Sequence, residues 1–107
     1  MILVKVQKQK TEITEITIKG HADSAPYGQD LVCAAVSAIV IGTLNAIEEM
    51  AEGSCEIEQN EARTVIAVKE INPTLSIILE VMLYQMRSIA ESYRQYLDIE
   101  EETSYEI

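Results

Sequence analysis

The order in which two hydrophobic periods alternate along this chain constrains its fold more than any other feature of the sequence. Apolar side chains recur at every second position in five segments, a spacing typical of half-buried β-strands. They recur at three- and four-residue steps in two longer segments, as on one face of an α-helix. The strand-like segments are residues 2–9, 13–19, 55–58, 64–69 and 97–107. The chain therefore predicts the element order ββαββαβ.

Residues at the ends of the two helical segments indicate where each helix starts and stops. Gly53 is suited to end the first helix, since glycine adopts the left-handed conformation found after a helix. Asn72 suits the N-cap of the second helix, and Pro73 suits its first helical position. The expected bounds are about Gln29 or Asp30 to Ala51 for the first helix and Pro73 to Leu97 for the second.

We expect the 107 residues to form a single domain, an α+β two-layer sandwich with two helices packed on one face of a mixed sheet. The first two strands are expected to form a hairpin. Ile13 is out of phase with Ile16 and Ile18, which indicates a β-bulge or a late start of the second strand. Cys55 is expected on the inward face of its strand as an inert core residue.

Charge and cysteine content narrow the classes of function. The formal net charge of −10 argues against direct contact with nucleic acid and favours a basic partner, although solubility alone also explains it. One histidine and two cysteines are too few for a structural zinc site, so we expect no metal and no cofactor. The N-terminus lacks a signal-peptide pattern, and no apolar stretch looks continuous enough to span a membrane. These features predict a cytoplasmic protein without a membrane partner.

His21 and Cys33 are the residues best suited to catalysis. Cys33 is expected in the first turn of a helix, where the positive end of the helix dipole favours the reactive thiolate form of a cysteine. His21 follows Gly20 at the end of a strand, and it is the only histidine available as base and cationic partner for a thiol. Taken alone, Cys33 would more often be a small buried hydrophobe. The pairing with His21 favours a Cys/His enzyme.

Two separated blocks of sequence carry a resemblance to a known family. The blocks are Gly20-His21-Ala22 and Gly28-x-Asp30-Leu31-Val32-Cys33-Ala34-Ala35-Val36-Ser37. They resemble the signature of the Prp family of ribosomal-processing cysteine proteases, with Leu31 where isoleucine is expected. The resemblance implies a bacterial endopeptidase that removes a short N-terminal extension from large-subunit ribosomal protein twenty-seven. It also implies that this apolar, extended arm docks with a phenylalanine near the cut.

Residues around the pair have supporting roles in this reading. Asp30 is expected as the N-cap of the helix, and in addition it can hold the imidazole of His21 in the needed tautomer. Ser37 lies one helical turn after Cys33, where it steadies the thiol or bonds to its own helix. Backbone N–H groups of the first turn are the expected donors to the oxyanion. The loop with Gly20, Ala22, Tyr27 and Gly28 is expected to contact substrate.

Two other classes of function stay open on the residues alone. In a non-catalytic ribosome-associated binding module, Cys33 and His21 would be structural residues. A thiol redox sensor is disfavoured, because Cys55 is too far along the chain to be an adjacent resolving cysteine. The wide apolar stripe of the second helix and the tyrosines Tyr93, Tyr96 and Tyr105, together with Ile107, predict a homodimer.

Overall fold

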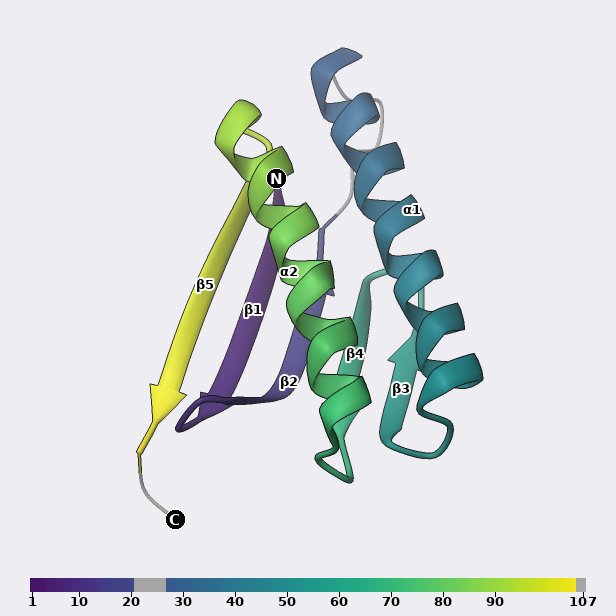
Figure 1. Ribbon diagram of the computed structural model, residues 1–107. Helices are drawn as coiled ribbons and strands as arrows, with labels where there is room; N and C mark the ends of the chain where they lie inside the picture. The colour runs from purple at the N-terminus through teal and green to yellow at the C-terminus, as the bar shows by residue number, and fades with distance from the viewer. Residues whose placement is uncertain (21–26, 106–107) are drawn as a thin grey trace.

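The computed structural model describes residues 1–20 and 27–105, with the backbone alone described for residues 27–30. Its elements follow the order ββαββαβ, which confirms the predicted α+β class (Figure 1). They are β1 (Ile2–Gln9), β2 (Glu12–Lys19), α1 (Tyr27–Met50), β3 (Cys55–Gln59), β4 (Arg63–Val68), α2 (Pro73–Ser92) and β5 (Leu97–Ser104).

The strands form one mixed sheet of order β3-β4-β2-β1-β5, and both helices cover the same face of it (Figure 1). Strands β1 and β5 are parallel, whereas the other neighbouring pairs are antiparallel. The β1–β2 register shifts between Gln7 and Lys8, where Lys8 lies opposite Ile13. Because β2 already begins at Glu12, the irregular phase of Ile13 reflects a bulge and not a late strand start.

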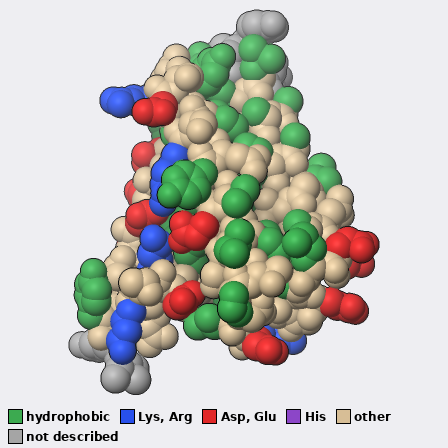
Figure 2. All heavy atoms as spheres, viewed as in Figure 1, with side chains coloured by type: hydrophobic (Ala, Val, Ile, Leu, Met, Phe, Trp, Pro, Cys, Tyr) green, Lys and Arg blue, Asp and Glu red, His purple; other side chains and the backbone are tan. Residues whose placement is uncertain are grey.

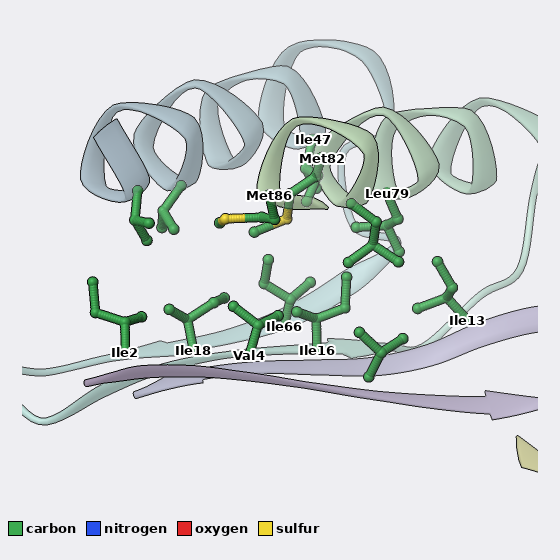
Figure 3. Close-up of a cluster of buried hydrophobic side chains, with 14 of the residues drawn as sticks. Ile2, Val4, Ile13, Ile16, Ile18, Ile47, Ile66, Leu79, Met82 and Met86 are labelled. Atoms are coloured by element: carbon green, nitrogen blue, oxygen red, sulfur yellow. The ribbon is translucent and has the colours of Figure 1, made fainter. Parts of the chain in front are cut away.

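The core lies between the sheet and the helices, and its side chains are mainly aliphatic (Figure 3). Met82 and Met86 of α2 are 1% and 0% exposed and point toward Ile16 and Ile66 of the sheet. Burial of an aliphatic side chain of this size stabilises a fold by about 1.5–3 kcal/mol. The methionines therefore fill the core, as their position on the apolar stripe of the helix predicts.

The second helix starts as expected and ends earlier than expected. The side chain of Asn72 accepts a hydrogen bond from the Leu75 N–H at 2.9 Å, and Pro73 is the first helical residue. The helix ends at Ser92 instead of continuing to Leu97. Leu97 fits the helical and the strand period equally well, and it is buried beside Ile2 in the parallel β1–β5 pair. Strand pairing decides the structure at this point.

The last strand is also shorter than the predicted segment 97–107, since β5 ends at Ser104. Only its start is buried: Leu97 is 1% exposed, whereas Tyr105 is 77% exposed. Ile107 lies outside the described residues.

Residues Leu31–Met50 of α1 are long and apolar enough to cross a membrane by length and composition, with a hydropathy of 1.9. From the sequence we expected no stretch apolar enough to span a membrane. The segment differs from that expectation because its few polar residues lower its mean hydropathy only slightly. In the fold, however, α1 contributes Val32, Val36, Val40 and Ile47 to the buried core.

Candidate active site

A cavity of about 230 Å³ brings together three of the residues that the sequence singles out, Gly20, Cys33 and Ser37. Its walls come from α1, from the ends of β1 and β2, and from the β3–β4 turn. The apolar part of the lining consists of Ile2, Ile18, Val36, Val40, Ile41 and Ala62. A half-buried thiol beside a cavity that is open to solvent, apolar on one side and polar at the β3–β4 turn, can receive a side chain of an extended peptide.

Cys33 lies at the edge of the buried stripe of α1. It is half-buried and packs against the core, while the flanking Val32 and Val36 are fully buried. Ser37 is one turn further along the helix and is exposed. Cys33 therefore packs partly against the core, as a small hydrophobic residue would, but it also lines the cavity.

The expected role of Asp30 as the N-cap is wrong. Helix α1 begins at Tyr27, so that Asp30 is a residue of its first turn and Cys33 a residue of its second turn. The cap preference of aspartate suggested the later start, and nothing in the local sequence outweighed it. As a consequence, the N–H of Cys33 is not one of the four free N–H groups at the helix start. First-turn placement thus does not explain the activation of the thiol or the binding of an oxyanion.

Gly20 has a structural role that the sequence did not reveal. Its φ is +91°, and a Cβ atom at this position would lie 2.4 Å from the backbone carbonyl oxygen of Met1. Both features exclude a side chain. Gly20 therefore fixes the path of the backbone at the end of β2, immediately before His21.

Several of the site residues predicted from the sequence are not among those that the structure describes. His21 and Ala22 lie outside the described residues, as do the side chains of Tyr27 and Asp30. The predicted approach of His21 to Cys33 and the predicted substrate loop, which includes Gly28, therefore remain predictions.

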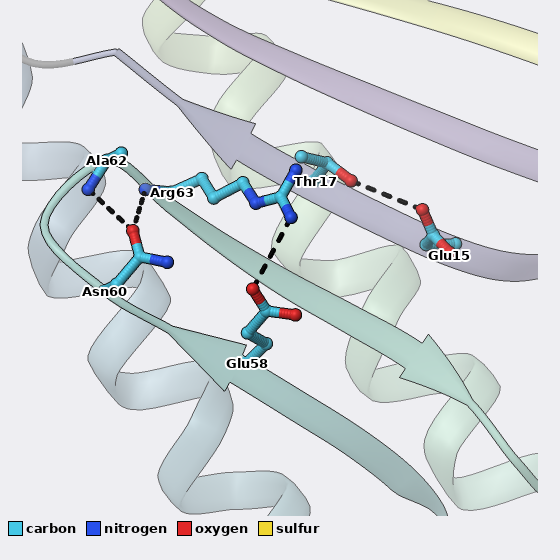
Figure 4. A network of polar contacts seen from close by, with 6 residues as sticks. All are labelled: Glu15, Thr17, Glu58, Asn60, Ala62 and Arg63. Carbon is cyan, nitrogen blue, oxygen red and sulfur yellow. Dashed lines mark hydrogen bonds and ion pairs between the residues drawn. The ribbon is translucent and has the colours of Figure 1, made fainter.

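The β3–β4 turn forms a wall of the cavity that sequence reasoning missed. Asn60 organises the turn, because its side-chain oxygen accepts hydrogen bonds from the N–H groups of Ala62 at 2.8 Å and Arg63 at 3.1 Å (Figure 4). The strand segments 55–58 and 64–69 predicted from the sequence require a connection here, but no local signal shows that this connection faces α1.

The guanidinium of Arg63 lies on the far side of the sheet, although Arg63 and Glu61 both border the cavity. The guanidinium of Arg63 pairs with Glu58 at 3.5 Å on the face of the sheet opposite the helices (Figure 4). Arg63 precedes the buried Thr64, and alternate residues of a strand point to opposite faces. Glu61 and Arg63 border the cavity at the β3–β4 turn, while the residues that α1 contributes to its lining are uncharged.

Cys55 lies apart from the cavity, at the start of β3. It is half-buried and packs against the core, and burial raises the pKa of its thiol. Among the described residues, no cluster of His, Cys, Asp or Glu suited to a metal ion is found. Cys33 is thus the cysteine with access to a cavity.

Comparison with solved structures shows which class of protein has this fold. A Staphylococcus aureus Prp protease, solved in complex with a covalently linked product peptide, has 29% sequence identity and a TM-score of 0.85, covering 95% of this chain and 100% of its own. The same protease with a substrate peptide has 27% identity, a TM-score of 0.84 and the same coverage. The fold is that of a cysteine protease.

Sequence relatives identify the family. The ribosomal processing cysteine protease Prp of Mycoplasma genitalium is 38% identical over 93 residues, which is 85% of this chain and 90% of the relative. The family model of cysteine protease Prp matches residues 1–98. The chain belongs to the Prp family of cysteine proteases.

Proposed function

We propose that this chain is an endopeptidase that removes the N-terminal extension of large-subunit ribosomal protein twenty-seven, with Cys33 as nucleophile and His21 as base. The observation that carries the proposal is the position of Cys33, half-buried at the edge of a solvent-open cavity, in a member of a family of cysteine proteases. The relatives are named for ribosomal processing, which supports this class of substrate.

The reaction uses the thiol and the imidazole in two stages. His21 takes the proton of Cys33, and the thiolate attacks the carbonyl carbon, forming a C–S bond while an electron pair moves onto the carbonyl oxygen. Collapse of this oxyanion breaks the C–N bond, and the imidazolium of His21 gives its proton to the leaving amine. Water then attacks the thioester with His21 as base, which releases the new carboxylate and restores the thiol.

Neighbouring residues assist this pair. Asp30 holds the imidazole of His21 in the tautomer that accepts the thiol proton, a role that does not require the N-cap position. Ser37 lines the same cavity as Cys33 and steadies the thiol. Gly20, Ala22, Tyr27 and Gly28 border the substrate, and the chemistry requires no metal or cofactor.

Charge favours the encounter with this substrate. The net charge of −10 attracts a basic ribosomal protein and repels nucleic acid, so the enzyme acts on the protein and makes no direct contact with RNA. The apolar part of the cavity beside Cys33 then receives an apolar side chain of the substrate arm.

The enzyme works in the cytoplasm, where its substrate is made. Although α1 is apolar enough for a membrane, it is the core helix of this fold and needs no membrane partner. The buried side chains Val32, Val36, Val40 and Ile47 support this, because they recur on one face of the helix and belong to the common core.

The functional unit is a homodimer formed through the outer face of the two helices. Hydrophobic side chains gather on this face (Figure 2), and Ile41, Ile77 and Val81 are 57%, 65% and 47% exposed. A groove between α1 and α2 is lined by uncharged residues, among them the small Ala38 and Gly42. Such a surface can pair with a second copy without bringing the acidic side chains together.

The test is to incubate the purified chain with the full-length ribosomal protein and to measure the product masses. The proposal predicts one cut that releases the N-terminal extension. If the substrate binds but its mass does not change, the chain is instead a non-catalytic ribosome-associated module. Sedimentation at micromolar concentration tests the dimer, and a monomer mass would contradict it.

A further inference from the structure

Thr64 of β4 is a largely buried polar residue in the part of the chain that the structure describes. It is 8% exposed, and its hydroxyl makes no hydrogen bond within the described parts of the chain. The other two polar residues found buried among those described have partners: Thr43 donates to the Ile39 carbonyl at 2.7 Å, and Ser54 accepts from Asn72 at 2.8 Å. Polar groups inside a fold are normally paired, so the position of the Thr64 hydroxyl requires an explanation.

The cavity beside Cys33 provides that explanation. No inaccessible side-chain oxygen or nitrogen of the described residues lacks a partner, so the free hydroxyl of Thr64 must be reachable by solvent. Thr64 lines the cavity together with Cys33 and Ser37. Its hydroxyl is therefore available to a group that enters the cavity.

The sheet register places a second polar side chain beside it. Gln59 on β3 pairs with Thr64, and Thr64 pairs with Ile18 on β2, which in turn pairs with Val4 on β1. Residues paired directly across strands share a face, so this row lies on the face that the helices cover. The row is apolar at Val4 and Ile18 and becomes polar at Thr64 and Gln59, where it meets the cavity. The side-chain amide of Gln59 also has no partner among the described residues.

The reaction needs hydrogen-bond donors near Cys33 that the start of α1 does not supply. A tetrahedral intermediate carries a negative oxygen, which donors must stabilise. Cys33 lies in the second turn of α1, beyond the four free N–H groups of the helix start. A threonine hydroxyl and a glutamine amide can both donate hydrogen bonds, and Thr64 and Gln59 both line the cavity.

We infer that Thr64, assisted by Gln59, donates hydrogen bonds to the carbonyl oxygen of the peptide bond that Cys33 attacks. This inference rests on the proposed function and deepens it. The oxyanion would then be bound by side chains of the sheet, across the cavity from the helix that carries Cys33. Their strands explain the geometry, because the turn held by Asn60 fixes the ends of β3 and β4 at the cavity.

The test measures kcat and KM of Thr64→Val with the ribosomal protein as substrate. Valine keeps the shape and removes the donor, so kcat should fall by about a hundredfold while KM changes little. Thr64→Ser should recover most of the activity, and Gln59→Met should show a smaller loss of kcat. The melting temperature and the rate of Cys33 alkylation by iodoacetamide should stay unchanged, which a merely structural role would not predict.

Thr17→Val is the matched control. Thr17 lies on β2, pairs with Val65 of β4, and is on the opposite face of the sheet from the cavity (Figure 4). This variant should retain wild-type kinetics. Wild-type kcat in Thr64→Val would overturn the inference, as would a change confined to KM. If the unmodified chain itself does not cut the ribosomal protein, the proposed function has failed instead.

Discussion

Replacement of Gly20 by alanine should destabilise the protein and impair its activity together. The φ of +91° imposes strain on any L side chain, at a cost of about 1–2 kcal/mol. The added Cβ would lie 2.4 Å from the carbonyl oxygen of Met1, and the overlap can be relieved only by moving backbone. Overpacking of this kind costs about 1–3 kcal/mol more. The free energy of unfolding should therefore fall by about 2–5 kcal/mol.

The two other described glycines separate these contributions. Gly53 has a φ of +78° but no atom within 4 Å of the added Cβ, so Gly53→Ala should show the strain alone, about 1–2 kcal/mol. Gly42 is helical and also has open space, so Gly42→Ala should gain up to about 1 kcal/mol from helix propensity. Urea denaturation measures all three, and a change of 1 kcal/mol corresponds to about 4–8 °C in melting temperature.

The activity of Gly20→Ala tests the link to the site. At a temperature where the variant is folded, kcat/KM should fall at least about tenfold, because small misplacements of catalytic groups are costly. Gly53→Ala should cut at the wild-type rate. Equal destabilisation in Gly20→Ala and Gly53→Ala would refute the close approach to Met1, and full activity in folded Gly20→Ala would refute its role in directing the chain into His21.

Three further variants test single features. Cys55→Ser should keep wild-type cleavage; since burial raises the pKa of the Cys55 thiol above its usual 9.0, that thiol stays protonated near pH 7 and should be alkylated more slowly than Cys33. Because the folded protein favours the protonated thiol, this shift contributes fully to the free energy of unfolding below about pH 9.0, and the contribution is lost as the pH rises through the folded-state pKa. Urea denaturation of the wild type and of Cys55→Ser at several pH values measures this loss. Asn72→Ala should lose about 1 kcal/mol of stability by removing the cap of α2, with unchanged kcat; a wild-type melting temperature would contradict this. His21→Ala should cleave the substrate about 10²- to 10⁴-fold more slowly, as expected for loss of a general base. A decrease in rate of less than about tenfold would argue against that role.

The sequence predicts features that depend on neighbouring residues along the chain. The order of elements along the chain, the bulge next to Ile13 and the cap at Asn72 follow from local period and local side-chain chemistry, and the structure confirms them. The helix bounds were less reliable. Asp30 is a good cap residue placed inside a helix, and Leu97 satisfies two periods at once.

The part of the site that the sequence missed depends on tertiary contacts. Gly20, Cys33 and Ser37 share a short segment and were found by their motif, and the structure brings them to one cavity. Thr64 and Gln59 reach the same cavity only through strand pairing and the packing of α1 over the sheet. Neither residue is unusual in its own strand, so no local pattern could identify it.

Alkylation of Cys33 followed by an activity assay tests the central claim most directly. Iodoacetamide is added to Cys55→Ser, in which Cys33 is the remaining thiol, and the alkylated fraction is measured by intact mass. Our account predicts that cleavage of the ribosomal protein falls in proportion to this fraction and reaches zero at complete modification. Cleavage that persists when Cys33 is fully alkylated would contradict the assignment of Cys33 as the nucleophile.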